Sequence, residues 1–184
     1  PGQYETVKIG NDIIKSQVLG TGVIGEVWIP QHSNTLLVCH KLYADWKGHQ
    51  GPITFYGDPA GGQKKSSGVQ GTDWELIENF FRQTEWRDRI TYDIPRGHPS
   101  VRSRINAMNA RIKSIDGIIR FMVDAAAAPH VVDDFERLTV LDGSSGEIDK
   151  KSNKQIGHLF DGVSYAIERR HPIFDGHAAS VIDL

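Results

Sequence analysis

Residues 53–62 read Ile-Thr-Phe-Tyr-Gly-Asp-Pro-Ala-Gly-Gly, a short apolar run that ends at an acidic side chain. The β-branched and aromatic residues at 53–56 predict a buried strand. The proline and glycines that follow remove a backbone donor and permit a sharp turn, so the strand stops there. Asp58 is therefore expected just beyond the carboxyl end of this strand, which is where open α/β sheets place their chemistry.

A second informative stretch is His158-Leu-Phe-Asp161, which lies within a helix-like segment. His158 and Asp161 are three positions apart and so share one helix face. The apolar residues around them predict a largely buried helix, and buried acids are rare unless they are paired or bind metal. Together with Asp58, these residues suggest a metal site for phosphate chemistry. The structural alternatives are a turn-capping Asp58 and a histidine hydrogen-bonded on a helix surface.

Residues 57–66 are similar to the phosphate-binding loop motif but do not match it. Gly57 and Gly62 have the required spacing, whereas Gln63 stands where the motif needs a lysine. Lys64 and Lys65 arrive too late to reach the phosphates from a fixed helix start. A nucleotide-binding loop is therefore not predicted.

The composition is that of one ordinary globular domain, here taken as residues 1–184 with a C-terminal tail at 173–184. The sequence lacks the long apolar run of a membrane span, so no membrane association is expected. Its single cysteine, Cys39, excludes an internal disulfide and a cysteine-rich zinc site, and its apolar neighbours predict core packing. An intracellular setting fits this cysteine content.

The net charge of −2 gives no overall sign of nucleic-acid binding, but the charge is unevenly spread. Residues 82–113 are rich in arginine, and one basic face can grip phosphates while the protein stays neutral overall. A solvated helix face is the simpler reading of the same run. Phosphate contacts are expected from Arg102, Arg104, Lys64, Lys65 and Lys150.

The order of elements predicts an α/β domain with a mixed sheet whose first strands are antiparallel. Hydrophobic period and turn residues predict strands at 4–9, 13–19, 23–29, 53–56, 90–94 and 118–123, and helices at 36–46, 72–81, 101–114, 130–140 and 155–170. A polar loop is expected at 142–153.

Several of these pieces, taken in order, resemble the C-terminal nuclease domain of tailed-bacteriophage terminase large subunits, the DNA-cutting part of a packaging motor. The resemblance covers roughly residues 23–172 and rests on an ordered set of motifs rather than on a single one. These are Glu26-Val-Trp-Ile-Pro with Ser33-Asn34-Thr35, Tyr56-Gly57-Asp58-Pro59-Ala60-Gly61, Thr72-Asp73, Arg104-Ile105 through Asn109 with Asp116-Gly117, and Asp149-Lys150 with His158-Leu-Phe-Asp161 and Tyr165.

The resemblance implies a ribonuclease H-like fold, also seen in retroviral integrases, in which helices flank a mixed sheet. It also implies two-metal hydrolysis of phosphodiesters by three acids, with Mg²⁺ or Mn²⁺ as the ions. Asp58 matches the second acid and Asp161 the third, with His158 as a further ligand that favours Mn²⁺. The first acid is either Asp12, although that residue is expected in a hairpin turn, or it lies upstream of Pro1 or is altered. Gly162 also departs from the alanine usual after the last aspartate.

The implied function is an endonuclease domain that cuts concatemeric viral DNA during genome packaging in the host cytoplasm. Its expected partners are double-stranded viral DNA, an ATPase motor domain of the same polypeptide, the small terminase and the portal. One alternative is a catalytically incomplete DNA- or protein-docking module of the same fold. Another is a resolvase or transposase-type nuclease.

Overall fold

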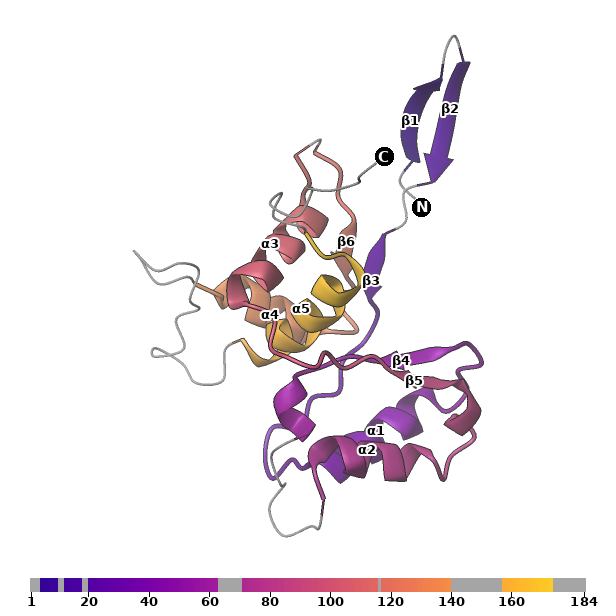
Figure 1. Cartoon of the computed structure of the whole chain (residues 1–184), viewed down its shortest axis with the longest axis vertical. Helices are drawn as coiled ribbons and strands as arrows, with labels where there is room; N and C mark the ends of the chain where they lie inside the picture. The colour runs from indigo at the N-terminus through magenta and orange to yellow at the C-terminus, as the bar shows by residue number, and fades with distance from the viewer. Residues whose placement is uncertain are drawn as a thin grey trace, which may run out of the picture.

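The computed structural model describes residues 4–9, 12–17, 20–62, 71–115, 117–139 and 157–173, with side chains from residue 20 onward. The described residues form a mixed α/β structure of helices and small sheets (Figure 1). In chain order the elements are β1 Tyr4–Ile9, β2 Asp12–Gln17, β3 Thr21–Val23, α1 Thr35–Trp46, β4 Ile53–Phe55, the 3₁₀ turn η1 Pro59–Gly62, α2 Asp73–Phe81, the 3₁₀ turn η2 Arg87–Arg89, β5 Ile90–Tyr92, α3 Val101–Ile112, β6 Phe121–Val123, α4 Pro129–Arg137 and α5 His158–Arg170.

The strands of the described residues pair two by two. β1 and β2 form the predicted antiparallel hairpin, β3 pairs in parallel with β6, and β4 pairs in parallel with β5. The sequence predicted one mixed sheet, whereas the structure describes three separate pairs. From β3 onward each strand is only three residues long, so each offers few ladder positions for a further neighbour.

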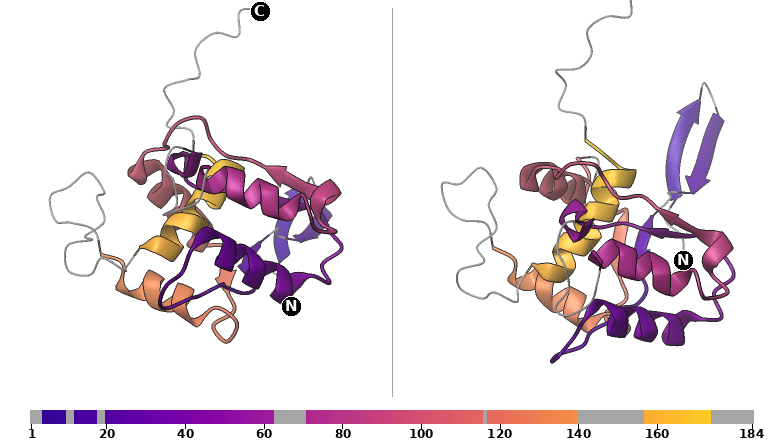
Figure 2. Two further views of the ribbon diagram at one scale, coloured as in Figure 1. Left: turned by 90° about the horizontal axis from the view of Figure 1, so that it is seen from below. Right: turned by 60° about the horizontal axis from the view of Figure 1, so that its bottom comes forward.

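Helices α1 and α2 lie side by side against the β4–β5 pair (Figures 1 and 2). Asn34 caps α1, and Thr72 with Glu75 forms a capping box at α2, as expected of these residue types before apolar-periodic runs. The buried centre of this half consists of Cys39, Phe81 and Trp86. Burial raises the pKa of the Cys39 thiol to about 11, and its position confirms the prediction of core packing.

A second hydrophobic cluster lies between α3, α4, α5 and the β3–β6 pair. Its fully buried members are Ala107, Met108, Phe121, Phe160 and Ile167. Each helix here presents one apolar face to the cluster, which is the usual way in which amphipathic helices are stabilised. The described part of the chain therefore has two cores rather than one.

Several element boundaries differ from the prediction for local reasons. The strand expected at 23–29 is β3 at Thr21–Val23, because its partner β6 ends where Asp124 begins a turn by accepting the backbone N–H groups of Ala126 and Ala127. The helix expected from 155 begins at His158, because Gly157 has a φ of +90° and cannot be helical. The loop expected at 142–153 and the tail at 174–184 lie outside the described residues.

None of the helices that the structure describes combines the length and apolarity needed to cross a membrane.

Candidate active site

Asp58 lies three residues beyond the end of β4, in the turn where it was predicted, and several contacts fix this turn. Its carboxylate Oδ1 accepts the backbone N–H of Ala60 at 2.7 Å, and its carbonyl oxygen accepts Trp74 Nε1–H at 3.0 Å. A Cβ atom on Gly57 or on Gly61 would lie 2.8 Å from the Trp74 ring, so both positions require glycine. Asp58 thus caps its own turn, yet half of its side chain stays exposed and available to a ligand.

His98 is a neighbour of Asp58 that the sequence analysis did not single out. It lies in the segment between β5 and α3, and its Nδ1 is 3.2 Å from Asp58 Oδ1. Its side chain is 55% exposed, so the pair is open to solvent and is an ion pair only when the histidine is protonated.

Asp161 is held on α5 by a buried arginine from α3. Arg104 Nη1 donates to Asp161 Oδ1 at 2.8 Å and to Ser164 Oγ at 2.7 Å. The Arg104 guanidinium also lies over the Tyr165 ring, with Cζ 4.5 Å from the centroid. The side chain of Arg104 is 7% exposed and that of Asp161 is 25% exposed, so this is a largely desolvated pair.

Tyr165 connects the two predicted catalytic acids. Burial, first of all, raises the pKa of its phenol, and the nearby carboxylates of Asp58 and Asp161 raise it further, while Arg104 opposes the rise. Two acids from distant parts of the sequence therefore act on one side chain. The sequence analysis named Tyr165 only as part of the family resemblance. Its position four residues after Asp161, on the same helix face, is the local signal that could have marked it.

His158 is exposed at the first position of α5, whose N-terminus is capped by a residue that the sequence analysis missed. Asp134, on α4, is 6% exposed and accepts the backbone N–H groups of Gly157 and Phe160, the latter at 2.8 Å. A long-range cap of this kind leaves no local signal, because the residue before the helix is a glycine.

Carboxylates suit Mg²⁺ or Mn²⁺, so the chemistry of Asp58 and Asp161 fits the ions that were expected, with the His158 imidazole as a softer donor. Among the described residues, however, no three His, Cys, Asp or Glu side chains are grouped as a ready metal site. The site as described thus offers two acids around Tyr165, one of them already paired with Arg104.

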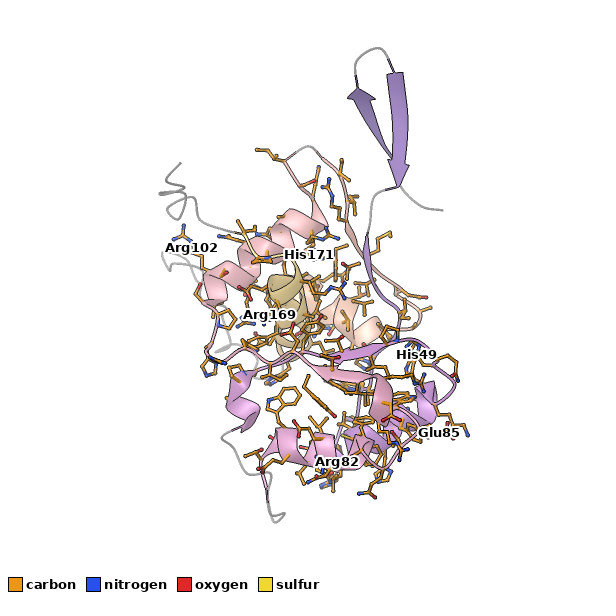
Figure 3. All side chains as sticks on the ribbon, turned by 45° about the vertical axis from the view of Figure 1, so that its right-hand side comes forward. His49, Arg82, Glu85, Arg102, Arg169 and His171 are labelled. Carbon is orange, nitrogen blue, oxygen red and sulfur yellow. The ribbon has the colours of Figure 1, made fainter. Side chains whose placement is uncertain are left out.

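The remaining predicted residues divide into three groups. Arg102 is exposed and points away from α3 (Figure 3), as a phosphate contact requires. Arg104 points inward, so its expected role in DNA contact is corrected to a partner of Asp161, because its charge is buried. Lys64, Lys65 and Lys150 lie outside the described residues.

Asp12, the candidate first acid, is the first residue of β2 and pairs with Ile9. Figure 1 shows its hairpin standing apart from β4, the strand that leads to Asp58. Asp12 was expected in the turn of the hairpin, but it is the first residue of the strand that follows the turn. The side chains of the hairpin lie outside the described part.

Glu26, which the sequence analysis quoted only as part of a motif, has a side chain that is 7% exposed. Its carboxylate accepts the backbone N–H groups of His130 at 3.2 Å and Val131 at 2.9 Å, and it pairs with His130 Nδ1. The His130 ring in turn stacks on Trp28 at 4.6 Å between centroids. Glu26 therefore caps α4 and is committed to the fold rather than to the Asp58 site.

Comparison of the chain with protein-family models, with curated protein sequences and with solved structures gives no significant match.

Proposed function

We propose that this chain is a divalent-metal-dependent DNA endonuclease domain of the terminase large-subunit type, with a ribonuclease H-like fold. The observation that carries the proposal is the placement of two held but partly exposed acids, Asp58 in the turn beyond β4 and Asp161 on α5, each of which raises the pKa of the Tyr165 phenol. The ordered motifs that resemble the terminase nuclease domain support it, since two of those motifs supply the two acids.

Asp58 and Asp161 would hold the ions, with His158 as a further donor. When bound, Mg²⁺ or Mn²⁺ would activate a water molecule and stabilise the leaving oxygen of the phosphodiester. The protein's own part is to present the acids in fixed positions. Ala60 and Trp74 fix the turn that carries Asp58, and Arg104 with Ser164 fixes Asp161.

Double-stranded DNA would be held through its phosphates rather than through base edges. Of the arginines predicted for this role, Arg102 is exposed on α3 and retains it. As part of a packaging motor in the host cytoplasm, the domain would act on viral DNA beside an ATPase motor domain, a small terminase and a portal.

A docking module without catalysis is the second candidate function. It is favoured by the Arg104–Asp161 ion pair, because an acid neutralised by an arginine has less need of a metal ion. It also agrees with the absence of a third acid beside the other two among the described side chains.

Cleavage of supercoiled plasmid separates the two functions. We expect Mn²⁺ to support nicking or linearisation and Asp58→Asn to reduce the rate at least about a hundredfold, because a neutral amide holds a divalent ion poorly. The matched control is Asp88→Asn, since Asp88 is 83% exposed and pairs only with its neighbour Arg87 among the described residues.

Asp88→Asn should cleave like the unmodified protein, and chelation of the metal should stop both. Undiminished cleavage by Asp58→Asn would rule out the assigned role. Absence of cleavage by the unmodified protein at any Mn²⁺ concentration, with DNA binding retained, would favour the docking module.

A further inference from the structure

We propose that Arg104 is a built-in competitor for the metal: a buried cation that holds the Asp161 carboxylate and lowers the affinity of the site for a divalent ion. This inference rests on the proposed function, because it concerns the residue paired with Asp161, one of the two proposed metal-binding acids. Arg104 touches neither DNA nor metal in this scheme and acts through Asp161.

The contacts of Arg104 converge on the acid side of α5. One nitrogen, Nη1, donates to both Asp161 and Ser164, and the guanidinium lies over the ring of Tyr165, whose phenol pKa the Asp58 carboxylate helps to raise. The positive charge therefore lies directly beside Asp161, one of the two carboxylates that would bind metal. A divalent ion on Asp161 would share that carboxylate with a guanidinium whose nitrogen is 2.8 Å from Oδ1.

Burial of Arg104 carries a cost that packing alone does not explain. Its Nε is buried without a hydrogen-bond partner among the described residues. Part of the guanidinium has therefore lost its contact with water without gaining a hydrogen bond in exchange. A buried ion pair is often no more stabilising than apolar residues of the same shape. The charge of Arg104 therefore adds little to stability, whereas it acts directly on Asp161.

The joint between α3 and α5 does not depend on Arg104 alone. Ala107 and Met108 of α3 pack against Phe160 and Ile167 of α5, and Ser103 Oγ donates to Glu168 Oε1 at 3.4 Å. Replacement of Arg104 by a residue of similar length should thus leave the helices packed. This makes an apolar variant a usable probe of the charge.

Manganese binding, followed by the loss of the free Mn²⁺ paramagnetic resonance signal, tests the inference without requiring cleavage. Arg104→Met should bind Mn²⁺ about tenfold more tightly than the unmodified protein, because the repulsion beside Asp161 is gone. Arg104→Lys should stay within about threefold of the unmodified protein, since it keeps the charge. Asp161→Asn added to Arg104→Met should abolish the gain and so place it at this carboxylate.

Each result of the Mn²⁺ binding measurement supports or overturns the role of Arg104. Equal affinity of Arg104→Met and the unmodified protein, or gain in Arg104→Lys as large as in Arg104→Met, would overturn the role of Arg104 and leave the proposed function standing. Binding only after Arg104→Met would support the competitor role and count against metal use by the natural sequence. No binding by either protein would overturn both.

Ser164→Ala keeps the test decisive if Arg104→Met does not fold. It removes the second anchor of Arg104 while keeping every charge, so a competitor role predicts Mn²⁺ affinity within about twofold of the unmodified protein. A loss of Mn²⁺ affinity in Ser164→Ala would show that alignment of Asp161, and not charge, is what Arg104 supplies, and would overturn the proposal.

Discussion

Fully and partly buried acidic residues in the described part of this chain have separate roles that their sequence contexts do not distinguish. Glu26 and Asp134 cap helices by accepting backbone N–H groups, whereas Asp161 pairs with an arginine near the candidate site. A backbone donor fixes a carboxylate without supplying a full opposing charge, and an arginine supplies one. The two kinds of acid should therefore respond differently to pH and to substitution.

The Glu26 cap should make the fold sensitive to acid. Burial alone would raise the pKa of Glu26, but the hydrogen bonds from His130 and Val131 outweigh it, and the net pKa lies below its ordinary value of 4.5. Its stabilisation is thus complete above that ordinary value and is lost as the pH falls through the lower folded-state pKa.

Urea unfolding at two pH values tests this pH-dependent stabilisation by Glu26. Glu26→Gln should cost about 1–2 kcal/mol at neutral pH and clearly less near pH 3. The control is Glu85→Gln, an exposed residue labelled in Figure 3, which should change stability little at either pH. A cost of Glu26→Gln that stays constant with pH would contradict the assignment.

At the scale of elements, α5 is positioned by a partner from another helix. Gly157, the residue before α5, has no side chain to serve as a cap. The unpaired backbone N–H groups at the start of the helix donate instead to Asp134 of α4. The orientation of α5, and with it the position of Asp161, depends on this contact.

Asp134→Ala should therefore lower the free energy of unfolding by about 2–3 kcal/mol, because two buried N–H groups would lose their acceptor. Its neighbour provides a matched control: Asp133 is 53% exposed and pairs with Arg137 one turn away, so Asp133→Ala should cost under about 1 kcal/mol. Equal costs of the two variants in urea unfolding would show that the cap contributes little.

The same elements show what the sequence could predict. Local signals were sufficient for α1 and α2, where cap residues precede an apolar period, and for the hairpin of β1 and β2. They were also sufficient to place Asp58 just beyond the end of a strand, because the proline and glycines that follow it mark the turn. They failed where distant residues decide the outcome: the inward turn of Arg104, the cap from Asp134 and the contact of His98 with Asp58 all depend on tertiary packing.

The whole described molecule has two hydrophobic cores, and the candidate site lies where their elements meet. Asp58 follows β4 of one core, whereas Arg104, Asp161 and Tyr165 belong to α3 and α5 of the other. A polar contact across this junction joins Arg169 of α5, which is labelled in Figure 3, to Asp93, with Nε donating to Oδ1 at 2.7 Å. The side chains of Asp58 and Asp161 remain 51% and 25% exposed at this junction, which suits a site that would admit a charged ligand.

DNA binding should reflect the outer face of α3 rather than its buried side. Arg102 is exposed there, whereas Arg104 is not, so only the first can neutralise a phosphate. Each neutralised phosphate contributes about 0.9 to the slope of log affinity against log salt. Arg102→Glu should therefore weaken binding of linear duplex DNA and reduce this slope by about one to two, without changing sequence preference.

The control for this measurement is Lys41→Glu. Lys41 is an exposed residue that pairs with Asp45 on α1, the helix that packs on the other hydrophobic core. It makes the same change in net charge but should leave the slope within about half a unit. Fluorescence anisotropy over a range of salt concentrations measures both slopes. If the two reversals lowered the slope equally, overall charge and not the α3 face would govern binding, and the assigned DNA surface would be wrong.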